Sequence, residues 1–225
     1  MTKPLIILAL LAALAWSTSA SAQTPPSAAE KQRYQNLHRA ALTGDLAALQ
    51  TLVANGAALN ARDDGGRTPA HVAAHAGQRE ALIALARAGA DLDALDHDQY
   101  DVVTIAAVAD NLPVLQAALQ HGASAANITS PYQGTALIAA AHLGHAAVVD
   151  ALINAGAPLD HINNLGWTAL IEAVVLGDGG TRHVDTVRLL VQAGADQTIT
   201  DRQGQTPRAL AAARTYQEIL ALLAP

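Results

Sequence analysis

The sequence contains no cysteine and no phenylalanine, and aromatic residues make up only 3% of its 225 residues. Without cysteine the chain cannot form a disulfide, a thiolate zinc site, an iron–sulfur cluster or a cysteine nucleophile. Large side chains normally fill the centre of a thick core, so their scarcity predicts a thin core between closely packed helices. Alanine, the best helix former, supplies roughly a quarter of the chain, which favours the same interpretation.

Charged residues are also scarce, at 14%, and the 13 Lys and Arg are outnumbered by 19 Asp and Glu, giving a formal net charge of −6. A nucleic-acid-binding protein needs a basic surface, so this balance argues against that class. The motifs G-x-S-x-G, H-E-x-x-H, G-x-x-x-x-G-K-[ST] and G-x-G-x-x-G are all missing, so no enzymatic activity and no cofactor are predicted.

The first 22 residues have the pattern of a secretory signal peptide. Lys3 precedes the apolar run LIILALLAALAW, and Ala20-Ser21-Ala22 matches an A-x-A cleavage site. The pattern predicts a mature chain that starts at Gln23, with residues 23–29 as a flexible lead-in. An uncleaved N-terminal anchor or a core helix is the alternative, although the run is shorter than the ~20 residues that span a bilayer.

Export without disulfides is more typical of a bacterial periplasmic protein than of a secreted eukaryotic one, with extracellular release as the second possibility. The mature chain would hold 12 Lys and Arg against 19 Asp and Glu, a net charge of −7. A protein of this charge suits a basic protein partner. We expect a monomer that binds no nucleic acid and, after cleavage of the signal, no membrane.

A repeat of about 33 residues runs through the rest of the chain. Gly-Ala pairs begin at 56, 89, 122, 156 and 194, with spacings of 33, 33, 34 and 38. A fixed period of this length indicates stacked structural repeats. Thr68-Pro69 and Thr206-Pro207 predict helix starts, with Thr as N-cap and Pro at the first helical position. Each Gly of a Gly-Ala pair predicts a bend after a second helix.

These segments resemble the ankyrin repeat family. The resemblance rests on GGRTPAHVAAHAG, QGTALIAAAHLGHAAVVDALINAGA and LGWTALIEAVVLG, which recur in register over residues 30–225. It implies an all-α solenoid of stacked helix–turn–helix–hairpin units. We assign six units, at 30–63, 64–96, 97–130, 131–163, 164–201 and a shortened cap at 202–225.

Two segments depart from the family pattern. Asp101-Val102-Val103-Thr104 replaces T-P-L-H in the third unit, and an insertion of about five residues at 178–182 separates Gly177 from His183. We expect the insertion to lengthen the link between two helices, either as a functional loop or as a tolerated surface change.

Histidines suggest two interpretations. His38 and His71 fall at the family's T-P-L-H position, and His145 and His183 open second helices, so these four are interpreted as structural. His75 and His142 share a variable position on the first helix and would face the concave side. Helical spacing could bring two imidazoles together at a metal, but no third ligand is evident in the sequence.

The predicted partner-binding surface is a stripe along the hairpin edge. Trp167 and Tyr100 occupy the same repeat position as Arg67, and a solenoid aligns equivalent positions. Tyr and Trp are enriched in binding hot spots. The full predicted set is Tyr100, Tyr132, Trp167, Arg67, His75, His142, His97 and Arg202.

The resemblance therefore predicts a non-enzymatic protein-binding module in the periplasm, acting through hairpin tips and the concave helix face. One alternative is a periplasmic inhibitor or immunity protein of a toxic enzyme. A metal-binding or enzymatic protein that uses His75 and His142 is the other.

Overall fold

The computed structural model describes residues 23–224. The predicted signal peptide, residues 1–22, lies outside the described residues. No helix in the described range combines the length and the apolarity that crossing a membrane requires.

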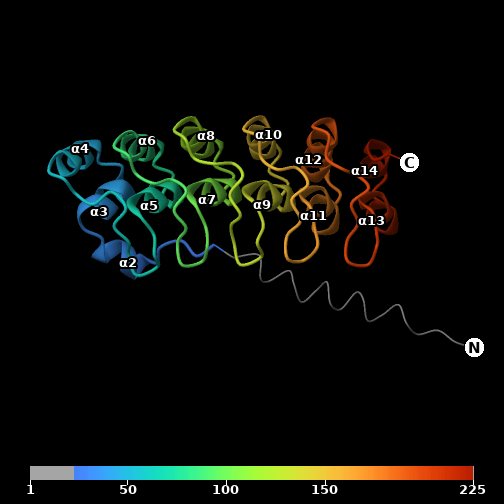
Figure 1. Ribbon diagram of the computed structural model, residues 1–225, viewed down its shortest axis with the longest axis horizontal. Coiled ribbons are helices and arrows are strands. Elements are labelled where there is room, and N and C mark those ends of the chain that lie inside the picture. Colours follow the sequence, from blue (N-terminus) through green and yellow to red (C-terminus); the bar gives the residue numbers. More distant parts are fainter. Residues whose placement is uncertain (1–22, 225) are drawn as a thin grey trace, which may run out of the picture.

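Six helix pairs follow a short N-terminal helix, and they form two rows in space. The first helices of the pairs lie in one row and the second helices in the other, with the connecting hairpins extending beyond the first row (Figure 1). The all-α solenoid is confirmed, since the only β-type pairing within residues 23–224 is a single bridge between Thr129 and Gly134. The elements are α2 (Ala28–Arg33), α3 (Asn36–Thr43), α4 (Leu46–Ala54), α5 (Pro69–His75), α6 (Arg79–Arg87), α7 (Val102–Val108), α8 (Leu112–Gln120), α9 (Ala136–His142), α10 (Ala146–Asn154), α11 (Ala169–Val175), α12 (Thr181–Gln192), α13 (Pro207–Ala213) and α14 (Gln217–Leu222).

Polar N-caps start the first helices, as the sequence predicts. Thr206 Oγ1 accepts the Ala209 N–H at 3.2 Å, and Pro207 takes the first helical position of α13. In the divergent third unit Asp101 replaces the threonine and accepts the Thr104 N–H at 2.7 Å. A side-chain oxygen at the N-cap satisfies a backbone N–H of the first helical turn, so Asp serves here in place of Thr.

Glycines in the left-handed conformation end the second helices. Gly156 follows α10 with φ +81°, as the repeat predicts. A residue with a Cβ is strained at this φ, which explains why the chain places glycine there.

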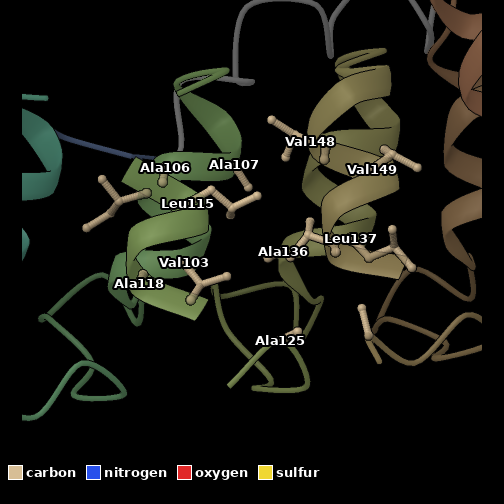
Figure 2. Close-up of a cluster of buried hydrophobic side chains, with 14 of the residues drawn as sticks. Val103, Ala106, Ala107, Leu115, Ala118, Ala125, Ala136, Leu137, Val148 and Val149 are labelled. Atoms are coloured by element: carbon tan, nitrogen blue, oxygen red, sulfur yellow. The ribbon is translucent and has the colours of Figure 1, made fainter. Parts of the chain in front are cut away.

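The core is a thin layer between the two rows of helices. Alanines on α7 and α9, such as Ala106, Ala107 and Ala136, allow close approach, and Leu115 and Leu137 fill the space between units (Figure 2). These side chains are almost wholly inaccessible to solvent. The core therefore continues from unit to unit without a break, as in other stacked-repeat proteins.

The insertion at 178–182 lengthens the link between α11 and α12, as expected, but by less than its own length. The link between α11 and α12 covers residues 176–180, only two more than the 143–145 link of the preceding unit. The remaining insertion residues extend α12 to 12 residues, where α10 has 9. Asp178 contacts the end of the link and the first turn of α12, since its Oδ1 accepts the Gly180 N–H at 2.9 Å and lies 3.0 Å from His183 Nδ1.

Candidate protein-binding surface

The hairpins that carry the predicted stripe are closed by a main-chain hydrogen bond. The Asp63 N–H donates to the Arg67 carbonyl at 3.0 Å, and the Asn163 N–H donates to the Trp167 carbonyl at 3.0 Å. Tyr100 occupies the same closing position, with its carbonyl 2.9 Å from the Asp96 nitrogen. Arg67, Tyr100 and Trp167 are thus structurally equivalent, as the sequence predicts.

The exposure expected for two of these residues is wrong. Arg67 is 4% exposed and Tyr100 is 3% exposed, whereas Trp167 is half-buried and packs against the core. The closing position is therefore not an exposed one in these two hairpins. Burial raises the pKa of Tyr100 to about 12. Neither Arg67 nor Tyr100 can serve as an exposed binding residue.

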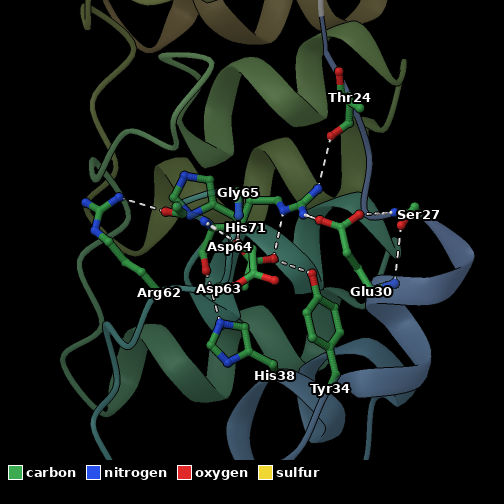
Figure 3. A network of polar contacts seen from close by, with 12 residues as sticks. Thr24, Ser27, Glu30, Tyr34, His38, Arg62, Asp63, Asp64, Gly65 and His71 are labelled. Carbon is green, nitrogen blue, oxygen red and sulfur yellow. Dashed lines mark hydrogen bonds and ion pairs between the residues drawn. The ribbon is translucent and has the colours of Figure 1, made fainter.

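Arg67 instead holds the N-terminal segment against the first units through its partners Thr24, Glu30 and Asp63, which Figure 3 labels. Its Nε donates to Asp63 Oδ2 at 2.8 Å, Nη2 pairs with Glu30, and Nη1 donates to the Thr24 carbonyl at 3.3 Å. Tyr34 adds a hydrogen bond from its hydroxyl to Asp63 Oδ2 at 2.5 Å. Residues that we expected to form a flexible lead-in are therefore tied to the repeat by a buried guanidinium.

The electrostatics of this network agree with its geometry. Burial alone would raise the pKa of Asp63, but the hydrogen bonds from Tyr34 and Arg67 outweigh burial and hold that pKa below its usual value. Burial, followed by the hydrogen bond to Asp63, raises the pKa of Tyr34. Asp63 is thus held as the carboxylate that Arg67 requires.

Sequence reasoning missed the helix that supplies half of this network. Ser27 Oγ accepts the Glu30 N–H at 3.2 Å, and Glu30 Oε2 accepts the Ser27 N–H at 2.7 Å. This reciprocal pair is a capping box, and Ser27-Ala28-Ala29-Glu30 is its sequence signature. The signature would have placed α2 before the first repeat.

A different set of hairpin residues forms an exposed apolar row. Leu95, Ile128 and Ile162 each stand directly before the residue that opens a hairpin, and they are 37%, 56% and 50% exposed. We call these three residues the apolar row. Tyr132, 42% exposed, lies in the longer hairpin of the fourth unit, which Thr129 and Gly134 close. One residue of the row occurs in each of three successive repeats, so its spacing was visible in the sequence. The prediction relied on the aromatic residues instead and did not include this row.

The row ends at polar residues on both sides. Arg62 stands at the equivalent position before the hairpin of residues 63–67, and its Nη1 donates to the Leu95 carbonyl at 2.6 Å. Thr200 stands at that position before the last hairpin and is exposed. The apolar row is therefore limited to the three hairpins in the middle of the chain.

The histidines interpreted as structural all bond to a neighbouring unit. His38 Nε2 lies 3.0 Å from the Arg67 carbonyl, and His71 Nε2 lies 3.0 Å from the Tyr100 carbonyl. His145 Nδ1 reaches the Ala107 carbonyl at 2.9 Å and His183 Nε2 the His142 carbonyl at 3.0 Å. Each of these imidazoles satisfies a carbonyl of the adjacent repeat.

The remaining predicted residues lie in separate places. His75 is half-buried, its Nε2 has no hydrogen-bond partner among residues 23–224, and burial lowers its pKa to about 4. His142 Nδ1 lies 3.2 Å from Oε2 of the buried Glu172. His97 and Arg202 are exposed, and Arg202 donates to the Asn164 carbonyl. Within residues 23–224, no group of three or more His, Cys, Asp or Glu side chains is placed to hold a metal ion.

Comparison with known proteins identifies the family. Family models for ankyrin repeats match residues 103–201 ("3 copies") and 37–86 ("many copies"). An ankyrin repeat domain from Acinetobacter baumannii AYE, solved by crystallography, is 40% identical with a TM-score of 0.79, and the match covers 83% of this chain and 94% of that one. The chain belongs to the ankyrin repeat family. Ankyrin repeats are protein–protein interaction modules and are generally not enzymes.

Two further relatives of this ankyrin repeat protein are informative. The ankyrin repeat protein YahD of Escherichia coli (strain K12) is 38% identical over 98 residues, which cover 43% of this chain and about half, 49%, of that relative. A chain in the structure of a predatory endopeptidase from Bdellovibrio bacteriovorus in complex with an immunity protein is 26% identical, with a TM-score of 0.65. That match covers 84% of this chain and 96% of the other.

Proposed function

We propose that this ankyrin repeat protein is exported to the bacterial periplasm and there binds a protein partner without catalysing a reaction. The observation that carries the proposal is the apolar row of Leu95, Ile128 and Ile162. Exposed apolar side chains that recur at one repeat position are aligned along a solenoid, and grouped exposed apolar residues mark interaction sites. Tyr132, exposed in the same group of hairpins, adds an aromatic side chain of the kind found at hot spots.

Export is supported by the sequence of residues 1–22 and by the absence of cysteine. Cleavage before Gln23 would also be compatible with the Arg67 network described above, since the Thr24 carbonyl, Glu30 and Asp63 all lie after that site.

A second candidate is a periplasmic inhibitor or immunity protein of a toxic enzyme. The likeness to a chain in an endopeptidase–immunity protein complex favours it over other binding roles. In this case the partner would be an enzyme, and the complex would form with fixed stoichiometry and block the enzyme's active site.

The test uses the full-length chain with a C-terminal affinity tag, expressed in a Gram-negative bacterium. N-terminal sequencing of the protein in the osmotic-shock fraction should give Gln23, whereas an intact Met1 would reject export. Size-exclusion chromatography after mild cross-linking should show the chain in a complex with a second protein. A chain that elutes alone from every fraction would reject the binding role.

The two candidates differ in what the partner does. If the partner is an enzyme, equimolar purified chain should abolish its activity, and the double variant Ile128→Thr/Ile162→Thr should restore that activity. If the partner is not an enzyme, or if the chain does not change its activity, the inhibitor function is excluded and the general protein-binding function remains.

A further inference from the structure

Charge is divided unevenly along the solenoid. Residues 88–181 contain ten Asp and Glu and not one Lys or Arg. Residues 23–87 hold seven Lys and Arg against five Asp and Glu, and residues 182–225 hold five against four. The net charge of −7 on residues 23–225 is therefore a charge of −10 in the middle, with ends of +2 and +1.

Most of the central carboxylates are exposed, and part of this charge lies beside the apolar row. Asp91, Asp93 and Asp98 belong to the segment that carries Leu95, and Asp160 stands two residues before Ile162. Within the described residues no Lys, Arg or His nitrogen comes within ion-pair distance of these four carboxylates. The charge of these four carboxylates is therefore not neutralised by a basic side chain of the described residues.

The middle of the solenoid thus combines an apolar row with unpaired carboxylates on its hairpins. The apolar row spans three hairpins, and the four carboxylates lie on the first and the third of them, since the middle one, residues 121–135, contains no Asp or Glu. Arg62 and Thr200 replace the apolar residues in the segments where the basic residues return. Oppositely charged surfaces attract over the Debye length, and apolar contact then stabilises the complex once the surfaces meet.

We propose that the hairpins of residues 88–101, 121–135 and 155–168 form a docking surface for a basic segment of a protein partner that presents Lys or Arg around apolar side chains. This inference rests on the proposed binding function and names the partner's chemistry. Nucleic acids and anionic lipid surfaces carry the wrong charge for this face. A second copy of the chain is also disfavoured, because a two-fold interface would bring two segments of −10 together.

The repeat itself supplies substitutions that preserve the fold. Asp93 Oδ1 accepts the Ser124 N–H at 2.8 Å, and Asn60 Oδ1 makes the equivalent bond to the Asp91 N–H at 2.9 Å in the preceding unit. Asn at position 93 therefore keeps the bond and removes the charge. In the same way Thr200 shows that threonine is accepted at the position of the apolar row.

The experiment maps the contact by photo-cross-linking in living cells. A photoreactive phenylalanine analogue is placed at Ile128 or Ile162 of the full-length chain. Control sites are Ala147, exposed on α10, and Gln203, exposed in the last hairpin. Adducts should form at 128 and 162 and not at 147 or 203, and the cross-linked peptide of the partner should carry a positive net charge.

The purified partner then allows the charge to be tested separately. The variant Asp91→Asn/Asp93→Asn/Asp98→Asn/Asp160→Asn should lower the affinity roughly tenfold at low salt. The control Asp45→Asn/Asp64→Asn/Asp196→Asn/Glu218→Gln removes the same charge from the end units and should leave affinity within about twofold. Thermal midpoints of both variants, followed by circular dichroism, establish that each is folded.

The outcomes separate this inference from the binding function itself. Adducts only at 147 or 203, a neutral or acidic cross-linked peptide, or equal affinity of the two charge variants would each overturn the basic docking surface and leave the binding function standing. The absence of adducts at all four sites would reject both.

Discussion

His71 on α5 donates from Nε2 to the carbonyl of Tyr100, 3.0 Å away in the hairpin of the next unit, while its Nδ1 accepts the Thr68 N–H at 3.1 Å. One buried imidazole therefore orders its own helix start and the adjacent hairpin. Burial lowers the pKa of His71, so the ring is held neutral, as a side chain with one donor and one acceptor must be.

Replacing His71 should destabilise the protein through an unpaired buried N–H. The variant His71→Ile introduces a residue that the fold accepts at this position, because Ile138 and Ile171 occupy the equivalent positions of later units. We expect a loss of about 1–3 kcal/mol in the free energy of unfolding, since the Thr68 N–H loses its acceptor. Urea denaturation measures the loss, and the exposed His97→Gln serves as the control. Equal midpoints for the two variants would contradict the role assigned to His71.

Substitutions of Tyr100 and Tyr132 should change the stability by different amounts, although the sequence placed both in one predicted binding stripe. Tyr100→Ala removes a buried ring and should cost roughly 3 kcal/mol of stability. Tyr132→Ala removes an exposed ring and should change stability by less than about 0.5 kcal/mol. Denaturant midpoints of the two variants decide this, and a large loss for Tyr132→Ala would show that its ring is structural.

Loss of Arg67 should unfold the N-terminal contacts. Arg67→Met leaves the carboxylates of Asp63 and Glu30 without their shared partner, at an expected cost of about 3 kcal/mol. Limited proteolysis should then cut near residues 23–34, where the wild type resists. Arg87→Met, at an exposed position of α6, should leave both measurements unchanged.

His75 should make the protein less stable in mild acid. Its pKa is about 4 in the folded state and near 6.5 in the unfolded chain, so between these values the unfolded state binds more protons. Stability from this group is complete above pH 6.5 and is lost as the pH falls towards 4, by about 1–2 kcal/mol between pH 6.5 and 5. The charged and titratable neighbours are His71, Arg67, Lys31 and Asp63, and the depressed pKa of His71 acts in the same direction.

The check is the pH dependence of the free energy of unfolding for wild type and His75→Val. Valine stands at the equivalent positions 108 and 175, so the variant should fold. Its stability should fall less steeply between pH 6.5 and 5. A slope identical to that of the wild type would mean that folding does not lower the pKa of His75.

Gly156 tests the register of the repeat. Its φ is +81°, and no atom lies within 4 Å of the place that a Cβ would take, so a substitution meets backbone strain and no collision. Gly156→Val should therefore cost about 1–3 kcal/mol, and Gly156→Asn clearly less, because Asn tolerates the left-handed region. Denaturant midpoints that rank the two variants in the opposite order would argue against strain as the cause.

The helices could be predicted because each unit repeats the same local signals. Thr-Pro starts, glycine ends and apolar spacing depend on residues close in sequence, so the 33-residue period was sufficient. The direction of a hairpin side chain depends on the unit beside it. Tyr100 and Trp167 share one position, yet the first is buried and the second is half-buried.

The Arg67 network could not be predicted for the same reason. Its partners Glu30 and Thr24 lie 37 and 43 residues away, on the segment that precedes the first helix pair. The insertion near Asp178 shows the converse case. Its length was visible in the sequence, but whether added residues lengthen a link or a helix depends on local contacts, here those of the Asp178 carboxylate with the Gly180 N–H and with His183 Nδ1.

The division of charge also determines how a partner arrives. A positively charged protein that diffuses near the solenoid meets a potential that is negative at mid-length and weakly positive at both ends. Such a field would direct the approaching molecule to the middle repeats rather than to either end of the solenoid. Adding further weakly charged units at either end would lengthen the molecule without slowing its association.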